Sequence, residues 1–282
     1  VNEFSNGHSR TQAEGALQEY LEKNSTVGIC GIDTRKLVRH IRQAGAQNAI
    51  ISSEIFDDNA LKAELAKVPD MASLELSSVV TTNEPYELGE GNTGKRVAVL
   101  DFGVKRSILK NFTERTCHLK VFPAKTTFKE IEEWNPDGYF LSNGPGDPAA
   151  MDYAVDTVKE ILNANKPLFG ICLGNQLLAR AVGVETYKMH HGHRGLNSPV
   201  KNLNTGLSEI TSQNHGFAVS MESLEASKEA ELTHVNLNDN TVEGLRLKNR
   251  PAFSVQHHPE SSPGPHDSRY LFDDFVELLT TK

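Results

Sequence analysis

The chain has 282 residues, a formal net charge of -8, and 38% hydrophobic and 23% charged residues. These values are typical of a globular protein with one large domain or two ordinary ones, and the negative charge argues against a nucleic-acid-binding surface. No apolar run approaches the roughly 18 residues of a membrane-spanning helix, and the polar start of the chain lacks the features of a signal peptide. The three cysteines are widely spaced and odd in number, which favours a reducing, cytoplasmic location over a disulfide framework.

The first part of the chain mixes helical and extended patterns. Helices are predicted at 17–23, 35–44 and 59–67, and strands at 27–32 and 49–51. Asp33 is expected to cap the second helix and Gly45 to end it. Residues 81–95 are rich in polar residues and glycine, which predicts a linker. We therefore expect a small, partial α/β domain over residues 1–80, the linker over 81–95 and a second domain over 96–282.

The second part alternates short apolar strands with helices. Strands are predicted at 97–100, 119–122, 138–141, 167–169 and 253–255, and helices at 105–111, 128–134, 153–163 and 175–181. Continuously apolar strands separated by helices predict an α/β fold with a doubly wound, mostly parallel sheet covered on both faces. Reactive groups in such sheets gather beyond the carboxyl ends of the strands, which is where Asn143–Pro148 and Cys172 fall.

Cys172 is the leading candidate for a nucleophile. It lies between Gly170 and Gly174, where a predicted strand turns into a predicted helix. This pattern is typical of a nucleophile elbow, a turn that usually carries serine. The positive end of the following helix favours a thiolate over a thiol. Cys30 and Cys117 have no such surroundings, and we expect them in the core.

A cysteine nucleophile needs a base, and the base needs an orienting group. His258 and Glu260 follow a predicted strand and are two residues apart, so in extended chain they point the same way. A carboxylate hydrogen-bonded to an imidazole raises its basicity and fixes its tautomer. An oxyanion hole would use the amide of Leu173 and the glycine-rich turn at Gly144 and Gly146.

Six stretches carry a resemblance to a known family. Three resemble the class I, triad-type glutamine amidotransferases: Ser142–Pro148, Gly170–Gln176 and His258–Glu260. The others resemble the small subunits of glutamine-dependent carbamoyl-phosphate synthase: Asp33–Leu37 with Gly45–Asn48, then Gln213–Val219, then Ser262–Asp267. The similarity runs from about Val27 to the C-terminus and implies a flavodoxin-like second domain.

The resemblance implies that Cys172 is the nucleophile, His258 the base and Glu260 its orienting partner. It also implies a set of glutamine-binding groups: the backbones of Gly144, Gly146, Leu173, Gly216 and Phe217, and the side chains of Gln176 and Asn214. Asn and Gln amides suit an uncharged carboxamide substrate. No metal ligand is expected, because His190, His191, His193 and His215 share no ligand-like spacing with a cysteine or carboxylate. These histidines are expected on a polar loop near the site, and His257 is expected to be structural.

The implied activity is hydrolysis of L-glutamine through a cysteine thioester. The ammonia would pass to a large synthetase subunit that makes carbamoyl phosphate for pyrimidine and arginine biosynthesis. Gly89–Lys95 has the Gly-x-x-x-x-Gly-Lys spacing, but Arg96 follows it where a phosphate loop has Ser or Thr. The chain therefore has no complete phosphate loop, so ATP and Mg²⁺ are expected on that partner and no cofactor, nucleic acid or membrane on this chain.

Two departures from the family pattern affect these expectations. The family has His where this chain has Asn175, and because the triad does not include this position we expect altered tuning rather than lost chemistry. Much of the family's N-terminal region, including a serine that binds glutamine, is expected to be absent.

Two alternatives to the implied function stay open. The chain could be the glutaminase subunit of a GMP, CTP or anthranilate synthase, or a catalytically idle interaction subunit.

Overall fold

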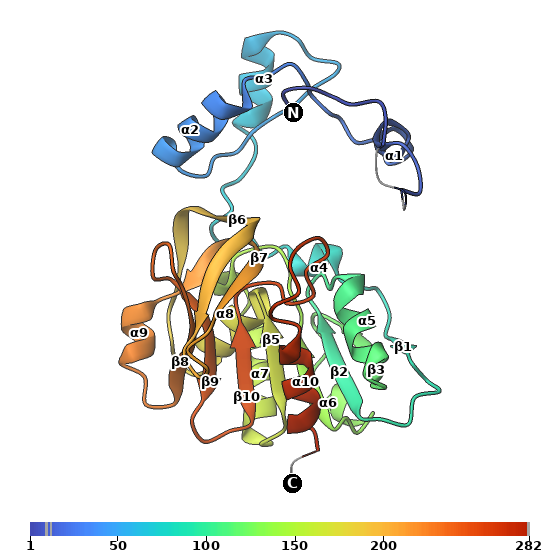
Figure 1. Cartoon of the computed structure of the whole chain (residues 1–282), viewed down its shortest axis with the longest axis vertical. Coiled ribbons are helices and arrows are strands. Elements are labelled where there is room, and N and C mark those ends of the chain that lie inside the picture. The colour runs from blue at the N-terminus through green and yellow to red at the C-terminus, as the bar shows by residue number, and fades with distance from the viewer. Residues whose placement is uncertain (9–10, 12, 281–282) are drawn as a thin grey trace. The chain divides into compact units, whose positions relative to one another are not determined.

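The computed structural model describes residues 1–8, 11 and 13–280 of the chain. The chain divides into two units, Val1–Asp70 and Met71–Lys282, and the second unit contains the sheet (Figure 1). No helix among the described residues is long and apolar enough to cross a membrane. The domain boundaries expected at 80 and 95 stay a prediction, although the expected linker contains a short strand.

The first unit contains three helices among its described residues: α1 (Leu17–Lys23), α2 (Thr34–Ala44) and α3 (Asp58–Leu65). The predicted cap of α2 is confirmed. Asp33 Oδ1 accepts a hydrogen bond of 2.9 Å from the amide of Lys36, and Gly45 ends the helix with φ of 85°.

Other expectations for the first unit are wrong. Residues 27–32 and 49–51 form no strand. Among the described residues, the first run makes only two backbone hydrogen bonds to the start of the chain, from Val1 to Ile29 and from Gly31 to Asn2, which do not build a ladder. None of the three helices has a buried residue, and the apolar face of α2 at Leu37, Val38 and Ile41 is exposed. Cys30, expected in the core, is exposed as well.

The second unit is built on one sheet of ten strands among the described residues, in the order β1-β3-β2-β4-β5-β10-β9-β8-β6-β7. The strands are β1 (Tyr86–Leu88), β2 (Arg96–Asp101), β3 (His118–Pro123), β4 (Gly138–Leu141), β5 (Leu168–Ile171), β6 (Thr186–Asn202), β7 (Ser208–Val219), β8 (Ala230–Asn236), β9 (Val242–Leu247) and β10 (Ala252–Val255). The helical segments are α4 (Ser77–Val80), α5 (Arg106–Glu114), α6 (Phe128–Glu132), the 3-10 turn η1 (Pro148–Ala150), α7 (Asp152–Asn163), α8 (Leu173–Ala181), α9 (Met221–Glu225) and α10 (Tyr270–Leu278).

The helices cover both faces of the parallel part of this sheet. Strands β3, β2, β4, β5 and β10 run parallel, and their buried side chains alternate between two apolar clusters. Helices α6, α7 and α8 pack on one face, and α5 and α10 on the other. The predicted doubly wound α/β fold is confirmed.

The remaining strands run antiparallel and lie at the two edges. β1 pairs with β3 inside the expected linker. β9, β8, β6 and β7 extend the other edge, and the sequence pattern predicted no elements for residues 186–247. Many of their side chains are exposed or polar, so these strands lack the continuous apolar runs that mark the parallel ones.

Substitution of Phe112 in α5 tests the packing on the sheet face that α5 and α10 cover. Its ring lies 5.0 Å from Phe140, 5.1 Å from Phe272 and 5.8 Å from Phe275 between centroids. Phe112→Ala should lower the free energy of unfolding by about 3–5 kcal/mol, measured by urea denaturation with Trp134 fluorescence. Leu207→Ala, at a side chain that is 68% exposed, should stay within about 0.5 kcal/mol of the parent. Equal losses in the two variants would contradict the assigned core.

Candidate active site

Cys172 occupies a strained turn between β5 and α8. Its backbone has φ of 55° and ψ of -101°, a region that costs a non-glycine residue about 1–3 kcal/mol. The Cys172 amide donates a 2.8 Å hydrogen bond to the carbonyl of Val255 on β10, which anchors the turn to the sheet. The sulfur therefore lies past the carboxyl end of β5 and at the N-terminus of α8, as the sequence predicts for a nucleophile elbow.

The two glycines of the motif are required by close packing. A Cβ on Gly170 would lie 2.7 Å from the carbonyl oxygen of Gly174, and a Cβ on Gly174 would lie 2.3 Å from that of Leu141. Both distances are shorter than real Cβ contacts allow. The helix thus approaches β4 and β5 so closely that only glycine fits on either side of Cys172.

His258 and Glu260 follow β10 and face each other. His258 Nδ1 donates a 2.8 Å hydrogen bond to Glu260 Oε1, and the amide of His258 donates to the carbonyl of Ser212. Both side chains are buried, Glu260 completely. Because Nδ1 carries the proton shared with Glu260, Nε2 is the nitrogen available to Cys172.

Lys105 adds a fourth charge that sequence reasoning missed. Its Nζ lies 2.8 Å from Glu260 Oε1, the oxygen that also accepts from His258. A buried carboxylate needs such partners to stay ionised. Lys105 precedes α5 by one residue, 155 positions before Glu260, so no sequence spacing could indicate this pair.

These contacts set the protonation states of the site. Burial lowers the pKa of His258, but Cys172 and Glu260 outweigh it and raise the pKa to about 10. Burial raises the pKa of Glu260, but His258 and Lys105 outweigh it and lower the pKa to about 2. At neutral pH His258 is therefore an imidazolium held against a carboxylate, the kind of neighbour that activates a cysteine nucleophile.

A cavity of about 630 Å³ opens over Cys172 and His258. Six of the seven expected substrate-binding residues line it: Gly144, Gly146, Gln176, Asn214, Gly216 and Phe217. The seventh, Leu173, is buried and does not line the cavity. As the first residue of α8, it still offers an amide without an intrahelical partner.

Gly144 and Gly146 hold the opposite wall close to the site. A Cβ on Gly144 would lie 2.1 Å from the carbonyl oxygen of Phe102. Gly146 has φ of 104°, a conformation that glycine adopts without strain. Asp147 fixes the end of this turn, because its carboxylate accepts from the amides of Ser73 and Ala149. The backbone of the turn is thus exposed to the cavity in one fixed conformation.

Gln176 and Asn175 share a buried amide network. Gln176 Nε2 donates to the carbonyl of Phe217 at 2.8 Å and to Gln256 Oε1 at 3.0 Å. Asn175 Nδ2 donates to the same Gln256 oxygen at 3.3 Å, and its Oδ1 accepts from Ser254. Asn175 therefore supports Gln256 and Gln176 from behind and does not face the cavity.

His190, His191, His193 and His215 lie on strands β6 and β7, so the polar loop expected for them is wrong. His190 and His191 are exposed on β6. His215 of β7 lines the cavity, in keeping with its expected place near the site. Arg194 of β6 lines it too, and this residue was not expected there. Cys117 is buried as expected, and burial raises its pKa to about 11.

Comparison with known families matches both units. Residues 98–278 match the family described as glutamine amidotransferase class-I, and residues 1–51 match the carbamoyl-phosphate synthase small chain, CPSase domain. Two curated relatives are each named carbamoyl phosphate synthase small chain. The one from Chlorobaculum tepidum is 51% identical over 99% of this chain and 76% of its own length, and the one from Syntrophotalea carbinolica is 50% identical over 96% and 75%.

A solved structure supports the fold. A GMP synthase component from Thermoplasma acidophilum aligns with a TM-score of 0.58 and covers 66% of this chain and 94% of its own. Its sequence identity is 22%, so the likeness concerns the fold alone.

The charge on Glu260 should control the reactivity of Cys172. Glu260→Gln removes one of the two groups, with Cys172, that raise the pKa of His258. His258 should therefore lose its proton at lower pH and favour the thiolate less near neutrality. We expect the rate of iodoacetamide alkylation of Cys172 at pH 7 to fall about tenfold or more and to approach the parent rate as pH rises.

Glu231→Gln is the matched control, since Glu231 is a surface carboxylate paired with Arg246. It should leave the pH profile of alkylation unchanged. A Glu260→Gln profile that overlays the parent profile would show that Glu260 does not govern the thiolate.

Proposed function

The chain belongs to the carbamoyl phosphate synthase small chains, and from that premise we propose that its cavity hydrolyses L-glutamine to glutamate and ammonia on Cys172. The observation that supports the proposal most strongly is the strained Cys172 at the cavity floor with His258 and Glu260 beside it. The chain spans about three quarters of the length of the Chlorobaculum tepidum relative.

The geometry accounts for each step of the reaction. The Cys172 thiolate attacks the carboxamide carbon, and the resulting oxyanion is stabilised by backbone amides of Leu173 and of the turn at Gly144 and Gly146. The imidazolium of His258 gives its proton to the departing nitrogen, so ammonia leaves and a γ-glutamyl thioester remains. His258 then takes a proton from water, the hydroxide displaces the sulfur, and glutamate is released.

The ends of glutamine need separate recognition. The amide groups of Gln176 and Asn214 line the cavity and suit the polar groups of an amino acid. The α-carboxylate needs a cation, and Lys105 is already paired with Glu260. Arg194 is available: it faces Asn214 across the β6–β7 ladder, and its Nη2 lies 3.4 Å from where a Gly216 Cβ would be.

The ammonia is proposed to pass to a large subunit that binds ATP and Mg²⁺ and makes carbamoyl phosphate for pyrimidine and arginine biosynthesis. The partner must supply this chemistry, because Gly89–Lys95, which has the glycine and lysine spacing of a phosphate loop, is followed by Arg96 instead of Ser or Thr and leads into strand β2 instead of a helix. The cytoplasm is the proposed compartment, since all three cysteines are free thiols. Relatives near 50% identity that carry the small-chain name favour this partner over a GMP, CTP or anthranilate synthase.

Cys172→Ser tests the assignment in the complex with the large subunit. Glutamine-dependent formation of carbamoyl phosphate should fall at least about 10³-fold, because a serine in this site is not ionised. Formation from added ammonium chloride should stay within about twofold, since that route bypasses the thioester. Equal loss with both nitrogen donors would contradict the proposed function. Cys117→Ser, at a buried thiol that does not line the cavity, checks that thiol loss alone has no such effect.

Arg194→Met tests recognition of the α-carboxylate. Loss of a charged hydrogen bond costs about 1.5–3 kcal/mol, so KM for glutamine should rise about tenfold to a hundredfold with kcat little changed. Lys201→Met, an exposed cation on the same strand, should leave both constants at parent values. An unchanged KM in Arg194→Met would remove Arg194 from substrate binding.

A further inference from the structure

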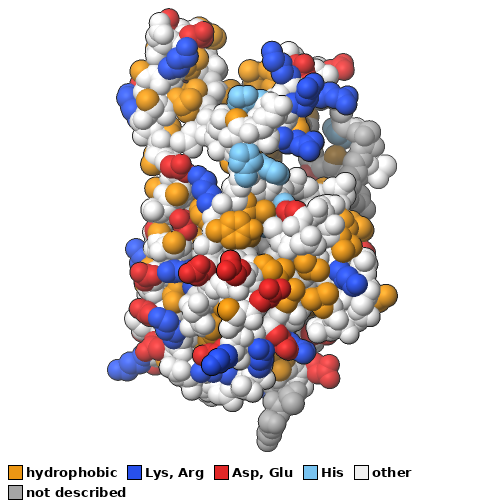
Figure 2. Space-filling view, turned by 90° about the vertical axis from the view of Figure 1, so that its left-hand side faces the viewer, with side chains coloured by type: hydrophobic (Ala, Val, Ile, Leu, Met, Phe, Trp, Pro, Cys, Tyr) orange, Lys and Arg blue, Asp and Glu red, His pale blue; other side chains and the backbone are white. Residues whose placement is uncertain are grey.

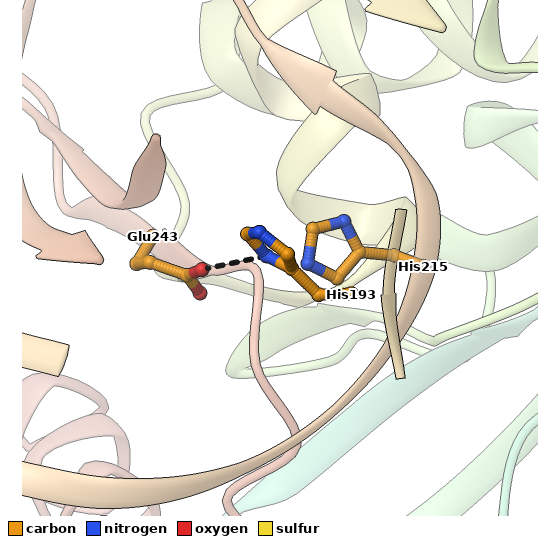
Figure 3. A group of neighbouring side chains, drawn as sticks. All are labelled: His193, His215 and Glu243. Atoms are coloured by element: carbon orange, nitrogen blue, oxygen red, sulfur yellow. Dashed lines mark ion pairs between the residues drawn. The ribbon is translucent and has the colours of Figure 1, made fainter. Parts of the chain in front are cut away.

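A second group of chemically capable side chains borders the cavity and has no part in the reaction above. His193 comes from β6, His215 from β7 and Glu243 from β9 (Figure 3). One ligand atom from each lies within 4.8 Å of the other two. Glu243 is completely buried, His215 nearly so, and the His193 side chain is 14% exposed.

The outer nitrogens of both imidazoles are committed to acceptors. His193 Nε2 lies 2.8 Å from Asp239 Oδ2, and His215 Nδ1 lies 2.9 Å from the carbonyl oxygen of Phe217. Carboxylate and carbonyl oxygens only accept, so the N–H groups must be on these two nitrogens. This leaves Nδ1 of His193 and Nε2 of His215 as the lone-pair nitrogens in the neutral rings, and Nε2 has only a 3.4 Å contact with Gln213.

This arrangement is typical of histidines that bind metals. Such residues donate the nitrogen that does not bind the metal to a carboxylate or a backbone carbonyl, which fixes the tautomer and directs the other nitrogen to the ion. His193 and His215 show one case of each. Figure 3 shows His193 between Glu243 and His215, with its ring nitrogen directed at the Glu243 carboxylate.

Glu243 is the second, independent indication of a missing cation. Its Oε1 accepts from Asn236 Nδ2 at 3.0 Å, but its Oε2 is buried without a hydrogen-bond partner. His193 Nδ1 lies 3.5 Å from Oε1 and His257 Nδ1 lies 3.8 Å from Oε2, and both contacts are too long for good hydrogen bonds. A fully buried carboxylate needs a compensating positive charge.

The donor set selects the ion. Two imidazoles and one carboxylate are the protein ligands of open Zn²⁺ sites, in which water fills the fourth position. Bonds of about 2.0–2.2 Å place tetrahedral ligand atoms about 3.4 Å apart. The three side chains therefore need only small rotations to close around an ion.

We propose that His193, His215 and Glu243 bind one Zn²⁺ ion, with Asp239 holding His193 from behind. The site was not visible in the sequence, because Glu243 follows His215 by 28 positions and lies on another strand. A proton on His193 is the alternative source of positive charge beside Glu243. Burial lowers the pKa of His193, but Glu243 and Asp239 outweigh the effect of burial, so the pKa is raised. Zinc would displace that proton.

The ion would cross-link three strands at the wall of the cavity. The β6–β7 ladder is irregular between Lys188 and His193, so this part of the wall lacks regular pairing. His215 lies between Asn214 and Gly216, both of which line the cavity. Bound zinc should thus fix the wall and lower KM for glutamine without changing kcat, an effect that rests on the proposed function.

Direct binding of Zn²⁺ tests the site independently of activity. The untagged chain in a Cys172→Ser background, in which the active-site thiol cannot bind the metal, is stripped with a chelator and titrated against a chromogenic zinc indicator. We expect one tight equivalent per chain. Glu243→Gln, which keeps the shape and the bond from Asn236, should weaken it at least about 100-fold, and Asp239→Asn about tenfold to a hundredfold.

Exposed histidines are the main source of false binding, since Figure 2 shows histidine side chains at the surface. His191→Ala removes an exposed histidine of the same strand and should leave the tight equivalent intact. Substitution by Co²⁺ should give the intense visible bands of a tetrahedral site, lost in Glu243→Gln. Equal affinity in the parent and Glu243→Gln, no tight equivalent at all, or loss in His191→Ala would each overturn the site. These outcomes are independent of whether Cys172 hydrolyses glutamine.

Discussion

At Cys172 the chain leaves β5 and enters α8 through a positive φ that a side chain normally avoids. The strain is sustained because Gly170 and Gly174 let the helix pack against the strands at distances that no Cβ allows, and because the Cys172 amide is bonded to β10. The same turn places the sulfur at the helix N-terminus and beneath the cavity. The position of the nucleophile, its partial activation and its access to substrate all depend on this one packing arrangement.

A line of ionisable groups extends that arrangement. It runs through Cys172, His258, Glu260 and Lys105, and His258 and Glu260 share one hydrogen bond. Lys105 helps to keep Glu260 ionised, and Cys172 and Glu260 together raise the pKa of His258. Residues of β6 and β7 also line the cavity, and Arg194 and the histidines of the proposed metal site lie on these strands. The proposed contact to the α-carboxylate and the proposed metal site therefore belong to the antiparallel part of the sheet, whereas Cys172 and the binding groups at Gly144, Gly146 and Gln176 belong to the parallel part.

Local patterns in the sequence were sufficient for the parallel part of the fold and for the triad. Gly170, Cys172 and Gly174 are adjacent, and His258 and Glu260 are two apart, so their geometry follows from one turn and one strand end. Lys105, Arg194 and Glu243 could not be predicted, because their partners are distant in sequence and only sheet order brings them together. The strand expected at 27–32 failed for the reverse reason: an apolar run predicts a strand only where another strand pairs with it.

The central claim is that Cys172 carries the γ-glutamyl group during turnover. Acid quenching of the complex with its large subunit during steady-state glutamine hydrolysis, followed by peptide mass spectrometry, measures this most directly. The account predicts a γ-glutamyl adduct on the peptide that contains Cys172, absent when ammonia replaces glutamine. An adduct on Cys30 or Cys117, or active turnover with no adduct on any cysteine under conditions that preserve thioesters, would contradict it.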